Sequence, residues 1–410
     1  MKNNSTFIKT FLFGIFSLIL LLMGAYFHDN IRKSYLYLFY NVEIKKTRDN
    51  NIASFDTQYH RGVVTVINLQ KSLKDFLNDP EFEIDSQMVS DQILSDQIHL
   101  LLSDGKLLKI NQQGQILEYL DLVKYLPDFS IVNKGIDGGY WIDSKNVLVY
   151  HLSEINGSFA MSLTWLQVDD NKISYIDHHT FGQLTEDETV ARGGGMLSYK
   201  KGLIIATGSH AIEIGTKSQD DNSNYGKVIF IDIKTIKMTG KFKEKDFKII
   251  AKGLRNPYGI VYSNNRYFLT DHGHSGGDMI SEIIEGGNFG RTLFDYGRAY
   301  DPELALLNNK PKNYIEPLFY FNPAIAPSDI SSCPFPNKLQ GYGNCLVVSS
   351  LRAESMFILK TQNSNPIIQS IEQIDVGERI RRIETIDTKV FLFTDDMNIY
   401  IINYIPDYVQ

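Results

Sequence analysis

The sequence predicts an all-β protein, a six-bladed β-propeller that follows an apolar N-terminal segment, and three observations support this fold class. Short apolar runs rich in Val, Ile, Leu, Phe and Tyr recur along most of the chain, and most of them end in turn residues such as Asp104-Gly105 or Asn156-Gly157. Helical periodicity is scarce. The roughly 350 residues concerned are too many for one β-sandwich, but they match six four-stranded blades of roughly 50–60 residues each.

The charge of the chain excludes one class of partner. The chain has 410 residues, a formal net charge of −7 at pH 7, and basic residues that are scattered rather than clustered. A protein that binds nucleic acid needs a basic surface to neutralise phosphates. We therefore expect no nucleic-acid partner.

The first 27 residues are predicted to form a signal anchor, a transmembrane helix that is not removed. Phe11 to Phe27 is an apolar run without charge, and Lys2 and Lys9 precede it. A cleaved signal peptide is the alternative, but Met23-Gly24-Ala25 is a poor cleavage site because Met stands where a small residue is needed. We expect a membrane-anchored protein whose folded part lies outside the cytoplasm, in the periplasm if the cell is Gram-negative.

Beyond the anchor, residues 28–55 are polar and predict a connector, and residues 56–410 are assigned to the propeller. The assignment rests on apolar runs that alternate with turns. The clearest predicted strands lie at Gly62–Asn68, His99–Ile110, Asn146–Leu152, Phe159–Val168, Leu203–Thr207, Lys227–Ile233, Tyr267–Thr270, Cys345–Ser349, Met356–Leu359 and Val390–Thr394.

Two short helices are also expected, Gln70–Phe76 and Leu120–Leu126, of which Pro127 would end the second. The last predicted strand, around Asn398–Ile405, is expected to pair with the first one, around Gly62–Asn68. This pairing would close the ring and remove its exposed sheet edges.

The two cysteines, Cys333 and Cys345, bracket a loop that contains Pro and Gly. In an oxidising compartment they can form a disulfide, and the alternative is a pair of free buried thiols. Their closeness in sequence and the export signal favour the disulfide, and the geometry decides between the two.

Three motifs narrow the function. They are Gly253-Leu254-Arg255-Asn256-Pro257-Tyr258-Gly259, the glycine-rich stretch Asp271–Asp278 followed by Gly286–Gly290, and Glu378-Arg379-Ile380-Arg381-Arg382. In this order they resemble the soluble quinoprotein glucose/sorbosone (aldose sugar) dehydrogenase family, over roughly residues 56–405. The resemblance implies a six-bladed propeller with its site on the central axis. It also implies a sugar substrate, oxidised by hydride transfer to PQQ, a quinone cofactor bound through calcium.

The resemblance also assigns residues to the cofactor. PQQ is a flat tricarboxylate, and the planar guanidinium group suits such an anion. By match, Arg255, Arg379, Arg381 and Arg352 would line the pocket, and Asn256 would bind the quinone region. Arg352 stands where the glucose enzymes usually have Lys. Strand alternation places Arg379 and Arg381 on one face and Arg382 on the other. The alternative to a cofactor site is that these arginines lie on a solvated strand edge.

The stretch Asp271–Asp278 carries the implied calcium site. The resemblance implies that the backbone carbonyls of Gly273 and His274 bind the ion, with Asp278 as a further ligand, and oxygen ligands suit calcium. Two alternatives remain open. His272-x-His274 resembles a transition-metal site, and Gly273-x-Ser275-x-Gly277 fits the nucleophile elbow of hydrolases, although the βα units that this motif needs are missing.

The match breaks at the general base. In the family a His takes the proton from the sugar, and its position is occupied here by Arg192. A guanidinium does not accept a proton at ordinary pH. Ser209 stands where an acidic residue would orient the base. Substitute bases would be His210, or His178 and His179 in what looks like a nearby loop.

Two functions therefore remain open. The first is a PQQ- and calcium-dependent sugar oxidoreductase, impaired by the loss of its base, with an unknown electron acceptor. The second is a catalytically inactive propeller of the same descent that binds an anionic carbohydrate or an envelope protein.

Overall fold

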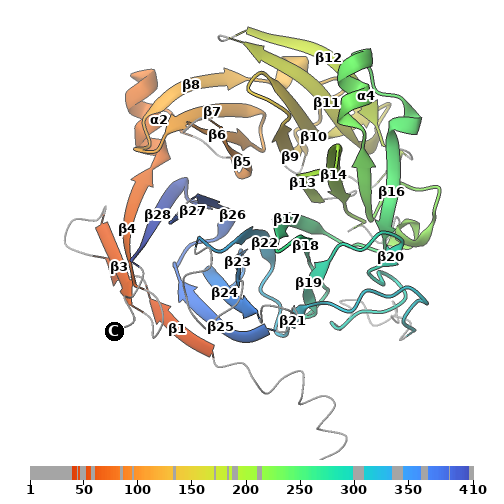
Figure 1. The fold of residues 1–410 in the computed structure, drawn as a ribbon. Helices are drawn as coiled ribbons and strands as arrows, with labels where there is room; N and C mark the ends of the chain where they lie inside the picture. The colour runs from red at the N-terminus through yellow and green to blue at the C-terminus, as the bar shows by residue number, and fades with distance from the viewer. Residues whose placement is uncertain are drawn as a thin grey trace, which may run out of the picture.

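The computed structural model forms six β-sheets arranged around a central axis, as a propeller (Figure 1). Each sheet contributes one strand to the innermost layer, and these six strands contact one another in a closed ring. The inner strands are β5 (Met88–Leu94), β9 (Ile136–Trp141), β13 (Gly193–Tyr199), β17 (Pro257–Ser263), β22 (Pro327–Ser332) and β26 (Ile380–Ile386). The structure describes residues 39–43, 45–46, 52–56, 61–83, 86–94, 97–132, 135–169, 172–181, 184–186, 193–209, 215–298, 309–334, 345–361, 368–386 and 388–405.

The outer strands follow antiparallel in each sheet. The second strands are β6 (Gln97–Leu102), β10 (Asn146–Ile155), β14 (Gly202–Thr207), β18 (Arg266–Asp271), β23 (Cys345–Ser350) and β27 (Lys389–Thr394). The third are β7 (Lys106–Asn111), β11 (Ser158–Asp169), β15 (Lys227–Ile231), β19 (Asp278–Glu282), β24 (Ser355–Thr361) and β28 (Asn398–Ile405). The fourth are β8 (Ile116–Asp121), β12 (Lys172–Thr180), β16 (Phe247–Lys252), β21 (Phe319–Phe321), β25 (Ile368–Asp375) and β4 (Arg61–Asn68).

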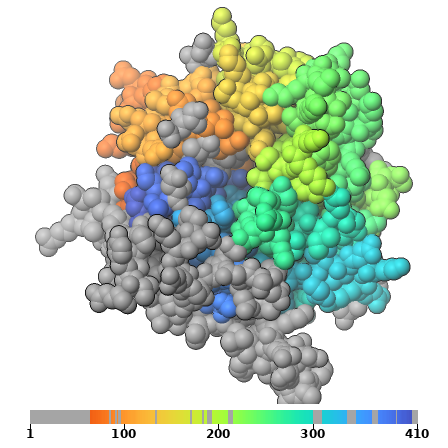
Figure 2. All heavy atoms as spheres, viewed as in Figure 1, coloured from red at the N-terminus to blue at the C-terminus, as the bar shows by residue number. Residues whose placement is uncertain are grey.

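The ring closes as the sequence predicts. β4, from the N-terminal part of the chain, pairs antiparallel with β28 near the C-terminus, so that Val64 lies opposite Ile402. Figure 2 shows the result on one face, where blue C-terminal atoms lie beside orange atoms from early in the chain. A ring with this joint holds the first and last blades together without a free edge between them.

The core lies between neighbouring sheets. One cluster combines Ile98 and Leu100 of β6 with Phe391 and Ile401 of β27 and β28, and thereby joins the last blade to the first. Middle strands such as β24 are buried at every position, because another blade covers each face. This explains why their sequences are continuous apolar runs rather than alternating ones.

Glycines mark the places where inner strands come closest. A Cβ on Gly138 would lie 2.3 Å from the Gly194 carbonyl oxygen, and one on Gly195 would lie 2.1 Å from the carbonyl oxygen of Tyr258. Gly193 and Gly194 also have positive φ angles of 121° and 100°. The three glycines from Gly193 to Gly195 begin β13, an inner strand whose backbone packs directly on its neighbours.

The two expected helices have different outcomes. The first is present as α2 (Leu69–Leu77), which the Asn68 side chain caps by accepting a hydrogen bond from the Lys71 amide. The second is wrong: residues up to Asp121 belong to β8, and only a 3₁₀ turn, η1 (Val123–Tyr125), follows. One helix was missed, α4 (Ile233–Thr239), which Asp232 caps and Gly240 ends.

The polar segment 28–55 is more than a connector. It contains β1 (Phe39–Glu43), β2 (Lys45–Lys46) and most of β3 (Ile52–Asp56). β1 adds in parallel to the edge of β25, and β3 pairs with β4. A fourth extra strand, β20 (Gly287–Asn288), lies parallel to β16. No helix among the described residues has the length and apolar character needed to cross a membrane, and Phe11–Phe27 lies outside those residues.

Candidate functional site

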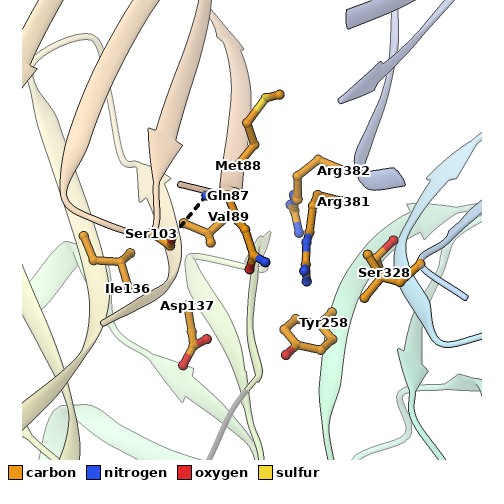
Figure 3. A pocket seen from close by; sticks show the side chains of 11 residues that line it. Gln87, Met88, Val89, Ser103, Ile136, Asp137, Tyr258, Ser328, Arg381 and Arg382 are labelled. Atoms are coloured by element: carbon orange, nitrogen blue, oxygen red, sulfur yellow. Dashed lines mark hydrogen bonds between the residues drawn. The ribbon is translucent and has the colours of Figure 1, made fainter. Parts of the chain in front are cut away.

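A pocket opens where the inner strands surround the axis. Its wall combines side chains from five inner strands, β5, β9, β17, β22 and β26, and from the turns beside them (Figure 3). The lining residues are Gln87, Met88, Val89, Ser103, Ile136, Asp137, Tyr258, Ser328, Leu351, Arg381 and Arg382. In Figure 3 the two guanidinium groups extend from β26 toward Gln87 and Tyr258.

A β-bulge brings Arg381 and Arg382 to the same pocket. Ile380 lies opposite Thr394 and Arg382 opposite Phe393, so Arg381 is the extra residue on its strand. Strict alternation would have sent Arg382 to the other face, and that expectation is wrong because a bulge re-aims the side chains that follow it. Arg379, by contrast, has a side chain that is 48% exposed and does not line the pocket.

The arginines at this end of β26 outnumber their carboxylates. Arg381 Nε and Nη2 donate to the two oxygens of Asp395, at 2.5 and 3.1 Å. Arg379 Nε donates to the same carboxylate at 2.9 Å. Two guanidinium groups thus share one negative charge. Arg382 Nε lies 3.3 Å from Asp329, and Asp137 also lines the pocket, so an anion that enters would meet two guanidinium groups and one carboxylate.

The turn that carries Arg255 and Asn256 lies directly before β17, whose Tyr258 lines the pocket. The buried carboxylate of Asp271 accepts hydrogen bonds from the Arg255 amide at 3.0 Å and from the Asn256 amide at 2.6 Å. Both side chains are nearly buried, with 7% and 6% exposed. Neither residue is among those that line the pocket, and their expected contact with the cofactor stays a prediction.

The side-chain oxygen of Asn256 has no hydrogen-bond donor among the described residues. His272 Nε2 donates to the Pro327 carbonyl oxygen at 3.0 Å, which leaves Nδ1 to accept from Asn256 Nδ2 at 3.3 Å. Burial, and then the charge of Arg255, lowers the pKa of His272 to about 3, so its ring is neutral. The Oδ1 atom of Asn256 is buried without a hydrogen-bond partner in the described part of the chain. Such an acceptor is costly unless a ligand satisfies it.

The loop between β18 and β19 is braced by Asp278. Its carboxylate accepts hydrogen bonds from the amide of Gly273 at 2.8 Å and from those of Ile325 and Ala326 at 2.7 Å each. Burial raises the pKa of Asp278, and these hydrogen bonds oppose that rise. Asp278 thus fixes the shape of the loop that would present the Gly273 and His274 carbonyls.

Both alternatives for this loop lose support. His272 uses both ring nitrogens as described above, and His274 bonds Asp295 through Nδ1 and Arg291 through Nε2, at 2.8 and 2.9 Å. Over the described residues, no three His, Cys, Asp or Glu side chains cluster in a way that could hold a metal. The nucleophile elbow is excluded as well, because Ser275 lies between two strands rather than before a helix.

The predicted base region is only partly described. Arg192 and His210 lie outside the described residues. Ser209 is buried, and its hydroxyl donates to the Leu254 carbonyl oxygen at 2.7 Å, so it braces the turn that carries Arg255. His178 and His179 lie on β12, the outermost strand of its blade, where the His179 ring stacks on Phe247. They are therefore too far out to replace the base.

The remaining predicted residues lie as follows. Arg352 is exposed just after β23, beside the pocket residue Leu351. Cys333 and Cys345 form a disulfide with their Cα atoms 5.3 Å apart. The sequence prediction missed Gln87 and Asp137 of the pocket wall. The glycine that follows Asp137 was an available signal, because inner strands need glycine where their backbones meet.

A propeller with an arginine-rich axial pocket is the class that fold and site define. A family model described as glucose / sorbosone dehydrogenase matches residues 143–403. This match covers more than half of the chain, and the chain therefore belongs to that family. The Arg255 turn and β26 lie within the matched region, whereas part of the pocket wall, from Gln87 to Asp137, precedes it.

Two curated relatives are similar in sequence. Aldose sugar dehydrogenase of Escherichia coli is 25% identical over 261 residues, which cover 59% of this chain and 67% of that protein. An uncharacterised protein of Synechocystis is 27% identical over 194 residues, or 45% of this chain. The match spans only 46% of the Synechocystis protein, less than half of its length.

Solved structures show the same fold. The apo-form of soluble aldose sugar dehydrogenase from Escherichia coli has a TM-score of 0.62 at 19% identity, and the alignment covers 84% of this chain and 99% of that one. The PQQ-bound aldose sugar dehydrogenase from Streptomyces coelicolor has a TM-score of 0.57 at 14% identity, with coverage of 83% and 98%.

Proposed function

We propose that this protein is a quinoprotein dehydrogenase that binds PQQ in the axial pocket and oxidises a CH–OH group of a sugar. The observation that carries the proposal is the pair Arg381 and Arg382 on the pocket wall, next to a carboxylate that two arginines share. A flat tricarboxylate matches such a wall in charge and in shape. The PQQ-bound structure of a relative supports the same assignment.

The residues present fit the cofactor. Arg381 and Arg382 would hold its carboxylates, and Arg255 would supply a further cation at the neighbouring turn. The unpartnered Oδ1 of Asn256, or its amide after a flip of the side chain, would meet the quinone region. The backbone carbonyls of Gly273 and His274 would hold calcium, because this ion prefers oxygen ligands. Asp278, whose oxygens already accept three amide hydrogen bonds, would shape this calcium site.

When bound, PQQ would supply the acceptor for a hydride from the sugar. The chain itself must bind and orient the sugar and must take its hydroxyl proton. The expected position of the base is Arg192, which cannot take a proton. Loss of a positioned base typically costs about 10²- to 10⁴-fold in rate, so we expect slow turnover. His210 remains the proposed substitute base, and the electron acceptor is open.

An apolar N-terminal segment and a disulfide support a location outside the cytoplasm. The apolar segment Phe11–Phe27 would anchor the chain in a membrane, and the disulfide between Cys333 and Cys345 fits an oxidising compartment. We therefore place the propeller on the outer side of the membrane as part of the proposal.

Reconstitution tests the proposed function. The purified chain is incubated with PQQ and calcium, and sugar-dependent reduction of a dye is measured over a panel of aldoses. We expect slow turnover that requires both additions and increases about 100-fold or more in Arg192→His. Arg266→His, on the outer part of another blade, is the matched control and should change nothing. Turnover abolished in His210→Ala would assign the proton to His210.

The second candidate is a catalytically inactive propeller that binds an anionic carbohydrate or an envelope protein. Arg192 in the place of the base favours it, because the substitution removes a proton acceptor and adds a cation. PQQ binding without any turnover, in the wild type and in Arg192→His, would support this candidate against the first one.

A further inference from the structure

The guanidinium of Arg291 is nearly buried and makes one hydrogen bond to the part of the chain that the structure describes. It follows β20 and is 9% exposed. Its Nη1 atom donates to Nε2 of His274 at 2.9 Å, and Nε is buried without a partner. Among the described residues, neither Nε nor Nη2 is bonded to a carboxylate. Buried guanidinium groups in proteins are normally paired with an anion, because burial without one is costly.

The two carboxylates whose charges act on Arg291, Asp271 and Asp295, accept hydrogen bonds from other groups. Asp295 accepts from His274 Nδ1 at 2.8 Å and from the Gly297 amide at 2.7 Å. Asp271 accepts from the backbone of the Arg255 turn. Burial, and then the positive charge of Arg255, lowers the pKa of Arg291 to about 10. The charge of Arg255 thus disfavours the cationic form of Arg291, while the charges of Asp271 and Asp295 favour it.

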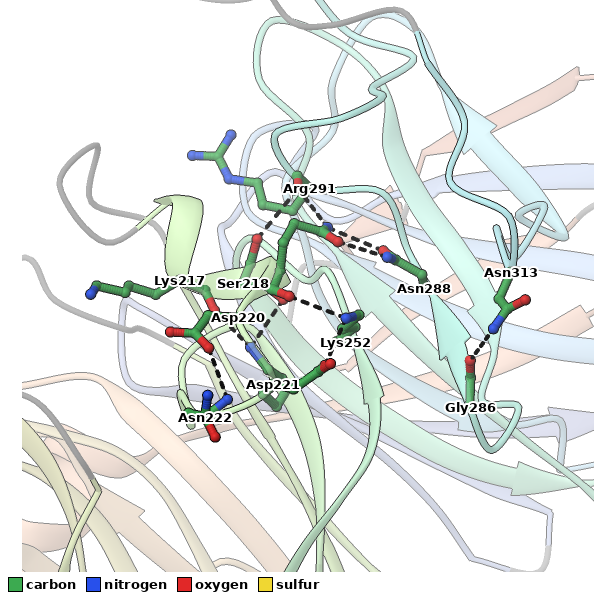
Figure 4. Close-up of polar contacts among 12 residues, drawn as sticks. Lys217, Ser218, Asp220, Asp221, Asn222, Lys252, Gly286, Asn288, Arg291 and Asn313 are labelled. Atoms are coloured by element: carbon green, nitrogen blue, oxygen red, sulfur yellow. Dashed lines mark hydrogen bonds and ion pairs between the residues drawn. The ribbon is translucent and has the colours of Figure 1, made fainter.

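Hydrogen bonds hold the backbone of Arg291, and its side chain points away from the residues that make them. Its carbonyl oxygen accepts hydrogen bonds from Gln219 Nε2 at 2.8 Å and from Ser218 Oγ at 3.3 Å. Gln219 also exchanges hydrogen bonds with Asn288. Figure 4 shows the guanidinium pointing away from this cluster. Because His274 fixes Nη1, the Nε–Nη2 edge is pre-oriented, and this edge is suited to a two-oxygen anion.

We propose that the Nε–Nη2 edge of Arg291, assisted by Arg255, binds an oxyanion group of the ligand, a carboxylate or a phosphate. This inference rests on the proposed function, because Arg255 belongs to the same site, and it narrows the ligand to an acidic one. The oxyanion belongs either to PQQ or to an acidic sugar. In both cases Arg291 contacts the ligand directly and adds a charge that the motifs alone do not predict.

Direct binding separates these sources. Isothermal titration of the full chain is performed with PQQ plus calcium, D-glucuronate, D-glucose 6-phosphate and, as the neutral probe, D-glucose. We expect Arg291→Gln to weaken at least one of the three anions by about 10- to 100-fold. Arg291→Lys should lose less anion affinity, because it keeps the positive charge but not the two parallel N–H donors of the guanidinium group. The matched control is Arg266→Gln, at a partly exposed arginine of β18 whose Nη1 lies 3.5 Å from Glu282.

The outcomes show whether Arg291 binds the cofactor, an acidic sugar or neither. Weaker binding of glucuronate or glucose 6-phosphate, with PQQ affinity unchanged, assigns Arg291 to an acidic sugar; weaker PQQ binding alone assigns it to the cofactor. Equal anion affinities in Arg291→Gln and wild type, or no anion binding by folded wild type, overturn the inference. Thermal unfolding shows whether a variant is folded, and Arg291→Lys remains informative if Arg291→Gln is not. The proposed function fails separately, if PQQ binds to none of these proteins.

Discussion

Arg381 donates two hydrogen bonds to Asp395, which lies in the turn after β27, and Arg379 donates a third to the same carboxylate. The sequence motif assigns both arginines to the cofactor, but in the structure Arg381 makes two of these hydrogen bonds and Arg379 makes one. Arg381 reaches the pocket because it is the bulged residue, whereas Arg379 remains half exposed at the rim.

The order of effects along β26 is the first prediction. PQQ affinity should fall most in Arg381→Gln, by about 10- to 100-fold, and nearly as much in Arg382→Gln, because both side chains line the pocket. Arg379→Gln should have the smallest effect. Fluorescence titration with PQQ and calcium measures the three affinities. A larger loss for Arg379 than for Arg382 would mean that strict alternation, not the bulge, describes the bound state.

Closure of the ring can be tested by stability. Ile402 of β28 is fully buried in the cluster that also contains Val64 of β4. Ile402→Ala should lower the free energy of unfolding by about 2–5 kcal/mol, because it leaves a cavity at the joint. Ile284→Ala, at a side chain that is 50% exposed, should change it by less than about 1 kcal/mol. Denaturant unfolding compares the two, and equal losses would argue against the joint.

Acid should destabilise the protein partly through His151. Its ring is fully buried, Nε2 lies 2.8 Å from Thr164 Oγ1, and burial lowers its pKa from 6.5 to about 3. Below about pH 6.5 the unfolded chain takes up a proton that the folded chain refuses. The stability contribution is therefore complete above pH 6.5 and is lost as the pH falls toward 3. The slope is at most about 1.4 kcal/mol per pH unit.

His151→Gln measures this contribution. Between pH 6.5 and 4 its unfolding free energy should fall less steeply than that of the wild type, whatever the two values are at pH 7. Parallel curves for the two proteins would show that His151 is protonated in the folded state.

Lys227 provides a test of the loop that supports Arg291. Its ammonium is buried and donates to the carbonyl oxygens of Lys217, Ser218 and Tyr225, at 2.8, 3.0 and 2.7 Å. Lys227→Met removes these three hydrogen bonds and should destabilise the protein by about 3 kcal/mol. Lys248→Met, at an exposed position, is the control. If the two variants unfold alike, the ammonium does not organise this loop.

The sequence predicted features that depend on local pattern and on motif. Apolar runs located the strands, and the pairing of the ends around Val64 and Ile402 followed from the need to cover sheet edges. The Arg255 motif located the turn directly before β17, whose Tyr258 lines the pocket. Register was less accessible, since one bulged residue changed the side to which Arg382 points.

Long-range polar contacts could not be read from the sequence. His274 was noted for its backbone, yet its side chain joins Asp295 to Arg291, two residues that no motif had marked. Gln87 and Asp137 of the pocket wall come from blades that precede the motifs. Such meetings depend on the ring bringing distant strands together, and no periodicity in the chain encodes them.

The central claim is that the axial pocket binds a quinone anion through the guanidinium groups of β26. The most direct test is a PQQ titration of the folded protein, with and without calcium, on the wild type and on Arg381→Gln. Saturable binding that calcium strengthens and that the variant weakens about 10-fold or more is the expected result. Wild-type protein that binds no PQQ, or a variant that binds it as well as the wild type does, would contradict the account.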